Sequence, residues 1–134
     1  MHTMVSRAGL AGLVCALLVA CGEPQVDNAA VASALAAAQT VEVTAQGRVV
    51  ALLPDGNGTD GPHQRFRLDL GNGVVVEVDH NLSLAPRVPL QVGDTVTLHG
   101  EFAPDPGNPV IHYTHHATGR HEGGWIMLKG QTYS

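Results

Sequence analysis

The fold of this chain is decided by the stretch Gln64-Arg-Phe-Arg-Leu-Asp-Leu70, Gly71-Asn72-Gly73, Val74-Val-Val-Glu-Val-Asp-His80. Apolar and polar side chains alternate on both sides of the central asparagine and its two glycines. A period of two is typical of strands that bury one face, and a short segment of glycine and asparagine is typical of a tight turn. The stretch therefore predicts a β-hairpin with strands over residues 64–70 and 74–80.

The length of the turn determines which residues face each other across this hairpin. A two-residue turn would set Phe66 and Leu68 opposite carboxylate side chains. A three-residue turn over residues 71–73 instead sets Phe66 opposite Val78 and Leu68 opposite Val76. Since this register keeps one face of the hairpin apolar, the sequence predicts the three-residue turn.

The predicted register also orders the charges on the other face of the hairpin. It places Arg65 opposite Asp79 and Arg67 opposite Glu77. Directly opposite residues of opposite charge stabilise a pair of strands. The charge pattern therefore favours the same register as the apolar pattern.

Further strands are expected on both sides of the hairpin, separated by segments rich in proline and glycine. The expected strands are residues 41–53, 64–70, 74–80, 95–102 and 110–114, with residues 125–128 as a last short strand or a lid. The expected loops and connections are residues 54–62, 81–92 and 103–109.

This pattern predicts an all-β fold over residues 41–134. Five short strands, a long first strand and a break between the third and the fourth are typical of a small Greek-key barrel of OB type. The run Leu90-Gln-Val-Gly-Asp-Thr-Val-Thr-Leu-His-Gly100 resembles the start of the fourth strand in many OB domains. An SH3-like barrel and a small sandwich are the alternatives.

Residues 21–40 precede the predicted domain and consist of a polar tether and a short Ala-rich helix. Asp27 or Asn28 is expected to cap the helix, which runs through residues 29–39. A helix of this length is marginal by itself. The sequence leaves open whether it docks on the domain or serves as a loose spacer.

The N-terminus carries the strongest indication of cellular location. Leu18-Val19-Ala20-Cys21 ends an apolar run that begins at Ala8, with Arg7 ahead of it, and resembles the bacterial lipoprotein signal. The run is shorter than the roughly 20 residues that a membrane span needs, and a charged start with small residues at its end is typical of a secretory signal. We expect residues 1–20 to be removed and Cys21 to carry the lipid; an ordinary signal peptide or a buried helix is the alternative.

Gly22, which follows the cysteine, favours the outer membrane over the inner one by analogy with enterobacterial sorting. The expected location is therefore the periplasmic side of the bacterial envelope, with the membrane as a partner through lipidated Cys21. The chain has two cysteines. Because Cys15 leaves with the signal and Cys21 is lipidated, we expect no disulfide, thiolate nucleophile or cysteine metal ligand.

The charge of the chain excludes some classes of partner. The formal net charge is −5 at pH 7 with neutral histidines. Sequence-independent binding of nucleic acid depends on basic residues facing phosphates, so we expect no nucleic-acid partner. Adhesion to anionic lipid by charge is likewise disfavoured, which leaves anchoring to the acyl chains.

Histidine is the residue type that points to chemistry, with eight in the chain. Pairing the fourth and fifth strands so that Phe102 faces Ile111 and Gly100 faces Tyr113 keeps their inner face apolar. The other face then sets Glu101 opposite His112 and His99 opposite Thr114. Diagonal neighbours lie roughly 7–8 Å apart, so these imidazoles and the carboxylate can converge on one ion.

The sequence therefore predicts a divalent metal site with Zn²⁺ or Cu²⁺ as suitable ions. The candidate ligands are His99, Glu101, His112, His115 and His116. His115 and His116 join this set only if the chain turns after Thr114. The alternative is that these residues line a solvated sheet face, with Glu101 and His112 as a simple polar pair.

Four further residues form a second group of candidates for ligand binding: His63, Arg65, His80 and His121. His80 falls on the apolar face at a strand end, where a hydrogen-bonded structural histidine is expected. His63 is expected at the start of a strand, and His121 in a turn.

Several short motifs taken together resemble one family. They are His63-Gln64-Arg65-Phe66, His80-Asn81, Leu84-Ala85-Pro86-Arg87, Gly93-Asp94, Gly100-Glu101, Ile111-His-Tyr-Thr-His-His116, Gly119-Arg-His121 and Gly124-Trp125. The combination resembles a bacterial envelope family, domain of unknown function 3465, over residues 45–133. The family pattern has an aspartate after the double histidine and a histidine near the C-terminus, where this chain has Ala117 and Leu128. The resemblance implies an envelope protein and supplies no activity.

These observations together predict a lipid-anchored periplasmic binding module that holds a divalent metal or a small anionic ligand on a histidine-rich face. A metal-dependent hydrolase, in which Glu101 or a histidine activates metal-bound water, is the second hypothesis. An envelope interaction protein, in which the histidines only tune surface charge, is the third. The expected partners are the membrane and either a small ligand or an envelope protein.

Overall fold

The computed structural model describes residues 24–134, so the predicted signal peptide and Cys21 lie outside the described residues. The described part is all-β with one short helix, as the sequence predicts. Its elements are α1 (Asn28–Ala36), β1 (Val41–Gly58), β2 (Gly61–Asp69), β3 (Val75–Asn81), β4 (Thr95–Ala103), β5 (Val110–His112), β6 (Trp125–Leu128) and β7 (Gln131–Tyr133). Within residues 24–134, no helix combines the length and the apolar character of a membrane span.

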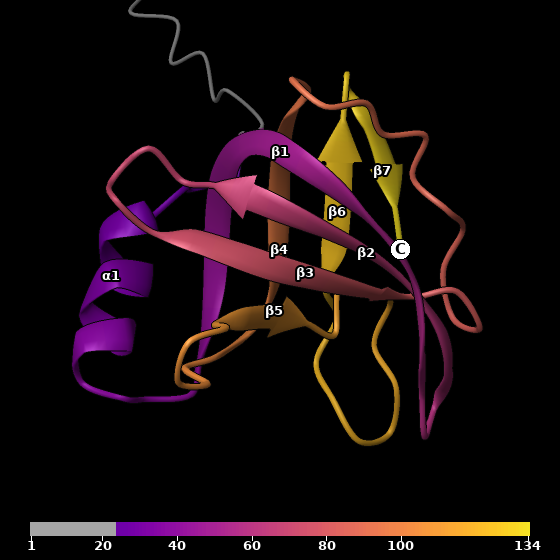
Figure 1. Cartoon of the computed structure of the whole chain (residues 1–134). Helices are drawn as coiled ribbons and strands as arrows, with labels where there is room; N and C mark the ends of the chain where they lie inside the picture. Colours follow the sequence, from indigo (N-terminus) through magenta and orange to yellow (C-terminus); the bar gives the residue numbers. More distant parts are fainter. Residues whose placement is uncertain (1–23) are drawn as a thin grey trace, which may run out of the picture.

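Five of the strands form a closed ring in the order β1-β2-β3-β5-β4, which the pairing of β4 with β1 completes (Figure 1). The neighbours are antiparallel except for β3 and β5, which are parallel. This closed order agrees with the OB-type arrangement expected from the sequence. The β6–β7 hairpin then extends the sheet from β4.

The β2–β3 hairpin has the predicted register. Phe66 pairs with Val78 and Leu68 with Val76, and all four side chains are fully buried. The Leu70 amide donates to the Val74 carbonyl at 3.0 Å, which closes the turn. The apolar face of the hairpin therefore forms one wall of the core inside the ring.

The prediction of a loop over residues 54–62 is wrong. β1 continues to Gly58 and pairs with β2 as far as Gly61, so only Thr59 and Asp60 form the turn. The pairing is irregular between Leu53 and Gly56. A bulge at this point accommodates a proline, which has no N–H to donate, and backbone pairing continues beyond it despite the turn-like composition.

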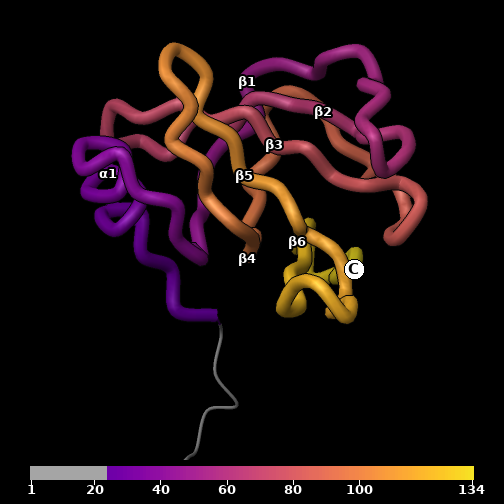
Figure 2. Tube along the Cα trace, turned by 90° about the horizontal axis from the view of Figure 1, so that it is seen from below, coloured from indigo at the N-terminus to yellow at the C-terminus, as the bar shows by residue number. Residues whose placement is uncertain are grey.

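The helix α1 docks on the ring, which answers the question that the sequence left open. Val31 and Ala34 are buried in the same core as the strands. Asp27 caps the helix by accepting a hydrogen bond from the Ala30 amide at 3.0 Å. The Asn28 side chain donates to the carbonyl of Leu70 at 3.0 Å, so α1 lies beside the β2–β3 turn, away from β6 (Figure 2).

The fifth strand is shorter than predicted. Phe102 pairs with Ile111 and Glu101 with His112 as expected. The predicted pairing of Gly100 with Tyr113 and of His99 with Thr114 is wrong. These pairs do not form because Tyr113 takes a left-handed conformation at φ 56° and ends the strand. β6 takes the place beside β4, where Trp125 pairs with His99, so residues 125–128 form a strand and not a lid.

Candidate metal centre

The pairing of β1 with β4 brings two carboxylates face to face on the outer side of the ring. Glu42 lies directly opposite Glu101, and Thr44 lies opposite His99. Like charges in this position destabilise a pair of strands. A cation between the two carboxylates would remove that repulsion.

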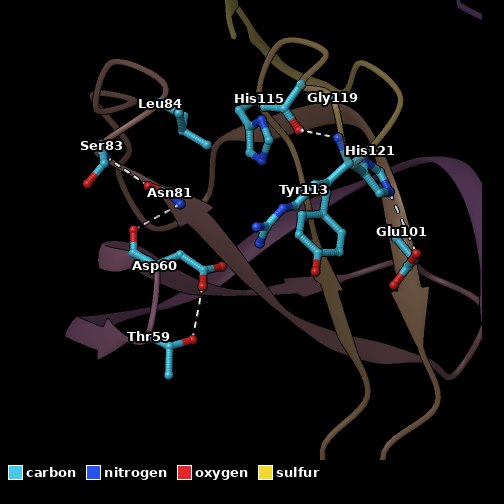
Figure 3. A pocket seen from close by; sticks show the side chains of 12 residues that line it. Thr59, Asp60, Asn81, Ser83, Leu84, Glu101, Tyr113, His115, Gly119 and His121 are labelled. Carbon is cyan, nitrogen blue, oxygen red and sulfur yellow. Dashed lines mark hydrogen bonds and ion pairs between the residues drawn. The ribbon is translucent and has the colours of Figure 1, made fainter.

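His121 reaches this pair from the segment that joins β5 to β6. Its Nε2 lies 2.8 Å from Glu42 Oε1 and 3.6 Å from Glu101 Oε2. The segment is held in place by backbone hydrogen bonds, one from Thr118 to the His121 carbonyl and one from Gly124 to the His115 carbonyl, at 3.0 and 2.7 Å. Figure 3 shows the His121 ring turned toward Glu101.

The contact made by Nδ1 of His121 determines the protonation that Nε2 has in the neutral ring. Nδ1 lies 2.7 Å from the Glu122 carbonyl, which only accepts hydrogen bonds, so Nδ1 carries a proton. A neutral ring would then point the lone pair of Nε2 at the Glu42 carboxylate. Either a second proton or a metal ion at Nε2 relieves this contact.

His99 approaches the other oxygen of Glu42. Its Nε2 lies 3.6 Å from Glu42 Oε2, and its Nδ1 lies 2.8 Å from the Thr44 hydroxyl. Glu42 Oε2 is buried without a hydrogen-bond partner among the described residues. The ring of His99 also stacks on that of Trp125, with 6.2 Å between the centroids.

The ligand atoms of these side chains form two groups. Glu42, Glu101 and His121 make one group, and Glu42, His99 and Glu122 make the other. Within each group the ligand atoms lie within 4.8 Å of one another. We call the five residues of both groups the Glu42 cluster.

A cleft of about 840 Å³ opens beside the Glu42 cluster. Glu101 and His121 belong to both the cluster and the cleft wall. In Figure 3, Asp60 and Asn81 lie on one side of the cleft, across from Tyr113 and the two labelled histidines. The cluster therefore has a space next to it that a small molecule can enter.

The comparison with known families bears on the whole of this region. A family model described as a protein of unknown function, DUF3465, matches residues 14–134. The chain belongs to the DUF3465 family. No curated protein and no solved structure matches it significantly. The matched range contains every residue of the Glu42 cluster, so this site lies within the DUF3465 region.

The five predicted metal ligands of this DUF3465 protein do not meet at one point. Glu101 and His112 are in contact, with 3.0 Å between Oε1 and Nε2. His115 is 3 % exposed and its Nδ1 contacts the His116 carbonyl at 2.8 Å, while the His116 side chain is exposed. The turn at Tyr113 separates these two histidines from the β4–β5 pair, and His99 instead faces Glu42.

Tyr113 packs between two of the histidines around the site. Its ring lies 4.1 Å from that of His112 and 4.2 Å from that of His121, measured between centroids. The φ of 56° that ends β5 thus also turns this ring into the stack. Tyr113 therefore supports the position of His121 beside Glu42.

The second group of candidates divides between structural and site residues. His80 is fully buried, with Nδ1 2.7 Å from the Thr114 hydroxyl and Nε2 2.9 Å from the Pro86 carbonyl. Burial lowers the pKa of His80, which favours the neutral ring. His63 contacts the Gly61 carbonyl at 2.9 Å, outside the cluster. Of the four residues in this group, only His121 belongs to the Glu42 cluster.

Arg65, the remaining candidate, belongs to a separate charged group on the β2–β3 hairpin. The residue pairs have the predicted register, but the side chains connect differently. Arg65 contacts Glu77 diagonally at 3.0 Å, whereas Arg67 approaches Asn108 at 3.5 Å and not Glu77. Arg65 is thus held by a buried carboxylate instead of facing a ligand.

Glu42 and Glu122 were missed by the sequence analysis. Glu42 lies on the polar face of the first strand, and its importance appears only once β1 is paired with β4 in register. Glu122 follows His121 directly, so their side chains share one loop. Two glutamates opposite each other in the β1–β4 pairing are the feature that would have indicated this site.

Proposed function

We propose that this DUF3465 protein is an envelope binding module that holds a divalent transition metal between Glu42, Glu101 and His121. The observation that carries the proposal is the position of His121. Its Nε2 faces the two carboxylates while its Nδ1 donates to a backbone carbonyl. Metal-binding histidines are characteristically oriented by such a bond from the second nitrogen.

The donor types favour a transition metal over calcium or magnesium. One imidazole nitrogen and two carboxylates suit Zn²⁺, and imidazole also suits Cu²⁺. Ions that prefer an all-oxygen shell, such as Ca²⁺ and Mg²⁺, would gain little from His121. Zn²⁺ is therefore the ion with which to test the site.

The proposed location rests on the sequence around Cys21. The Leu18–Cys21 motif supports removal of residues 1–20 and anchoring through a lipidated Cys21, with the outer membrane favoured by Gly22. Replacing Cys21 with serine should release the protein from the membrane fraction and abolish incorporation of labelled palmitate. Unchanged membrane association of the serine variant would contradict the lipid anchor.

The cleft supports a second candidate function, a metal-dependent hydrolase. Glu101 and His121 line it, so a metal they hold would face a bound molecule, and metal-bound water is a nucleophile at neutral pH. Turnover of a p-nitrophenyl ester or phosphodiester by the zinc-loaded protein, lost in the variant Glu101→Gln, would favour this candidate. Binding of zinc without turnover of either compound would favour the binding module.

The metal proposal is tested by equilibrium dialysis of the full chain in mild detergent against Zn²⁺. Removing a ligand should weaken binding at least as much as removing an outer partner of a metal site, which costs about 10–100-fold. We therefore expect His121→Ala to weaken zinc binding at this position by about 100-fold or more. The matched control His116→Ala removes an exposed histidine outside the cluster and should leave binding unchanged. Equal binding by both variants would contradict the proposal.

A further inference from the structure

We propose that the Glu42 cluster holds two divalent metal ions, with the carboxylate of Glu42 bridging them. This inference rests on the proposed function and deepens it, because the first ion is the one held by Glu101 and His121. The second ion lies between Glu42, His99 and Glu122. The geometry points to a pair because the two oxygens of Glu42 face different histidines.

The ligand atoms of the Glu42 cluster divide between two positions. The two groups share Glu42 and nothing else. Each group has one histidine, the shared carboxylate and one carboxylate of its own, Glu101 in the first and Glu122 in the second. A single ion would use one group and leave the other, with the same donor composition, without a role.

His99 and His121 are oriented alike with respect to Glu42. In both, Nδ1 lies close to an oxygen, the Glu122 carbonyl for His121 and the Thr44 hydroxyl for His99. In both, Nε2 is the nitrogen that faces Glu42. Both histidines therefore direct Nε2 at the same carboxylate, with an oxygen holding Nδ1 on the far side of each ring.

The charges of the carboxylates and one unsatisfied oxygen also favour two ions. Among residues 24–134, the ion-pair partners of Glu42 and Glu101 are all histidines. Glu42 Oε2, on the side of His99, is buried and lacks a hydrogen-bond partner among the same residues. An ion at the first position satisfies Oε1 alone, whereas a second ion also satisfies Oε2 and offsets the charge of Glu122.

A shared carboxylate also sets the spacing of the two ions. In two-metal sites the ions lie about 3.5–4 Å apart and act together on bound oxygen atoms. Two Zn²⁺ ions, or two other ions that accept imidazole and carboxylate, are therefore the ligands that this site would take. The competing interpretation is that His99 is an imidazolium that pairs with Glu42 and that only one metal binds.

The test counts zinc ions per chain. The full chain in mild detergent is stripped with a chelator and dialysed against Zn²⁺, and bound metal is measured per protein. We expect two ions for the unchanged protein and one ion each for His99→Ala and His121→Ala. Glu42→Gln should weaken both sites, whereas the exposed control His116→Ala should retain two ions.

A second readout uses His121→Ala, in which only the second position is expected to remain. The chain has a single tryptophan, Trp125, and its ring stacks on that of His99. Binding of Co²⁺, which quenches indole fluorescence at short range, should therefore quench Trp125 in the unchanged protein and in His121→Ala. Quenching should be lost when Glu122→Gln is added to His121→Ala. Glu122→Gln alters an exposed side chain and serves as a second variant should His99→Ala fail to fold.

The outcomes separate this inference from the proposed function. Two ions, with one lost in each histidine variant, would support the bridged pair. One ion that is lost in His121→Ala and kept in both His99→Ala and Glu122→Gln would overturn the pair and leave the metal-binding function standing. Absence of zinc binding by the unchanged protein would overturn both.

Discussion

Arg65 binds Glu77 diagonally across the β2–β3 hairpin, although the residue directly opposite Arg65 is Asp79. Its Nη2 lies 3.0 Å from Glu77 Oε1, while its Nε lies 3.8 Å from Asp79 Oδ1. Asp79 Oδ1 is buried and has no hydrogen-bond partner among the described residues. Burial first, and then the hydrogen bond and charge of Glu77, raise the pKa of Asp79 to about 7.

This relationship predicts how stability depends on pH. The folded protein holds the Asp79 proton more tightly than the unfolded chain, in which the pKa is 3.8. The resulting stabilisation is complete below pH 3.8 and is lost as the pH rises toward and through 7. Asp79→Asn mimics the protonated form, so we expect it to raise the free energy of unfolding at pH 8 by about 1–3 kcal/mol.

Urea unfolding at pH 5 and pH 8 checks this prediction. The difference in stability between the two pH values should shrink in Asp79→Asn. The control Asp105→Asn alters an exposed carboxylate and should keep the difference seen in the unchanged protein. An undiminished difference in Asp79→Asn would show that Asp79 does not hold the proton.

The lowered pKa of His80 predicts a pH dependence of stability of the opposite sign. Its folded pKa is lowered, chiefly by burial, so the neutral ring stabilises the fold above the unfolded pKa of about 6.5 and this stabilisation is lost as the pH falls. His80→Gln should reduce stability at pH 7 by about 1–3 kcal/mol, because the Thr114 hydroxyl and the Pro86 carbonyl lose well-placed partners. The same variant should lose less stability than the unchanged protein between pH 6.5 and 5.

Thermal unfolding of His80→Gln and of His116→Gln over that pH range provides the comparison. His116 is exposed, so its replacement should leave the acid dependence as it is. If the His80 variant loses stability with acid as steeply as the control, another group is responsible.

Gly124 is predicted to be essential for the entry into β6. A Cβ at this position would lie 2.2 Å from the Tyr113 carbonyl oxygen and 2.6 Å from that of His99, both in the backbone. Gly124→Ala must therefore displace β6, and we expect a loss of about 2 kcal/mol or more. Gly119→Ala, whose Cβ would meet nothing within 4 Å, should change stability by less than about 0.5 kcal/mol.

Urea unfolding measures both glycine variants, and zinc binding adds a functional readout. Since β6 lies beside His99, Gly124→Ala should also weaken binding at the Glu42 cluster. Equal stability of the two variants would mean that the close approach of the backbone at Gly124 is relaxed in solution.

The docking of α1 predicts that the helix contributes to global stability. Val31 is fully buried in the shared core. Val31→Ala removes two methyl groups and leaves a cavity, so we expect the free energy of unfolding to fall by about 2 kcal/mol. Val50→Ala, at a side chain that is 43 % exposed, is the control and should cost much less. A Val31 effect as small as that of Val50 would indicate a helix that is detached in solution.

The parts of the fold that were predicted from sequence depend on local patterns. The β2–β3 register follows from the turn and the alternation of Phe66 and Leu68 with charged residues, which lie close together in the chain. The all-β class and the position of β4 follow from the same kind of alternation. These features need no knowledge of how distant strands meet.

The candidate site was predicted poorly because it depends on contacts between distant residues. Glu42 meets Glu101 only through the β1–β4 pairing, and that pairing needs a register that neither strand specifies alone. The predicted extension of β5 failed at Tyr113, because a left-handed conformation is uncommon for tyrosine and carries no sequence signal. His121 was recognised as a candidate, but its partners were not.

The parallel contact between β3 and β5 is the shortest strand pairing in the ring. Only Glu77 with Val110 and Val78 with Ile111 are paired there, and the Glu77 amide adds one bond to the Pro109 carbonyl at 2.9 Å. So short a contact opens locally at a lower free energy than the long β1–β2 pairing, and its amide protons should exchange with deuterium first. Because the loss of the Asp79 proton places a second negative charge beside Glu77, this contact should open more readily as the pH rises above 7.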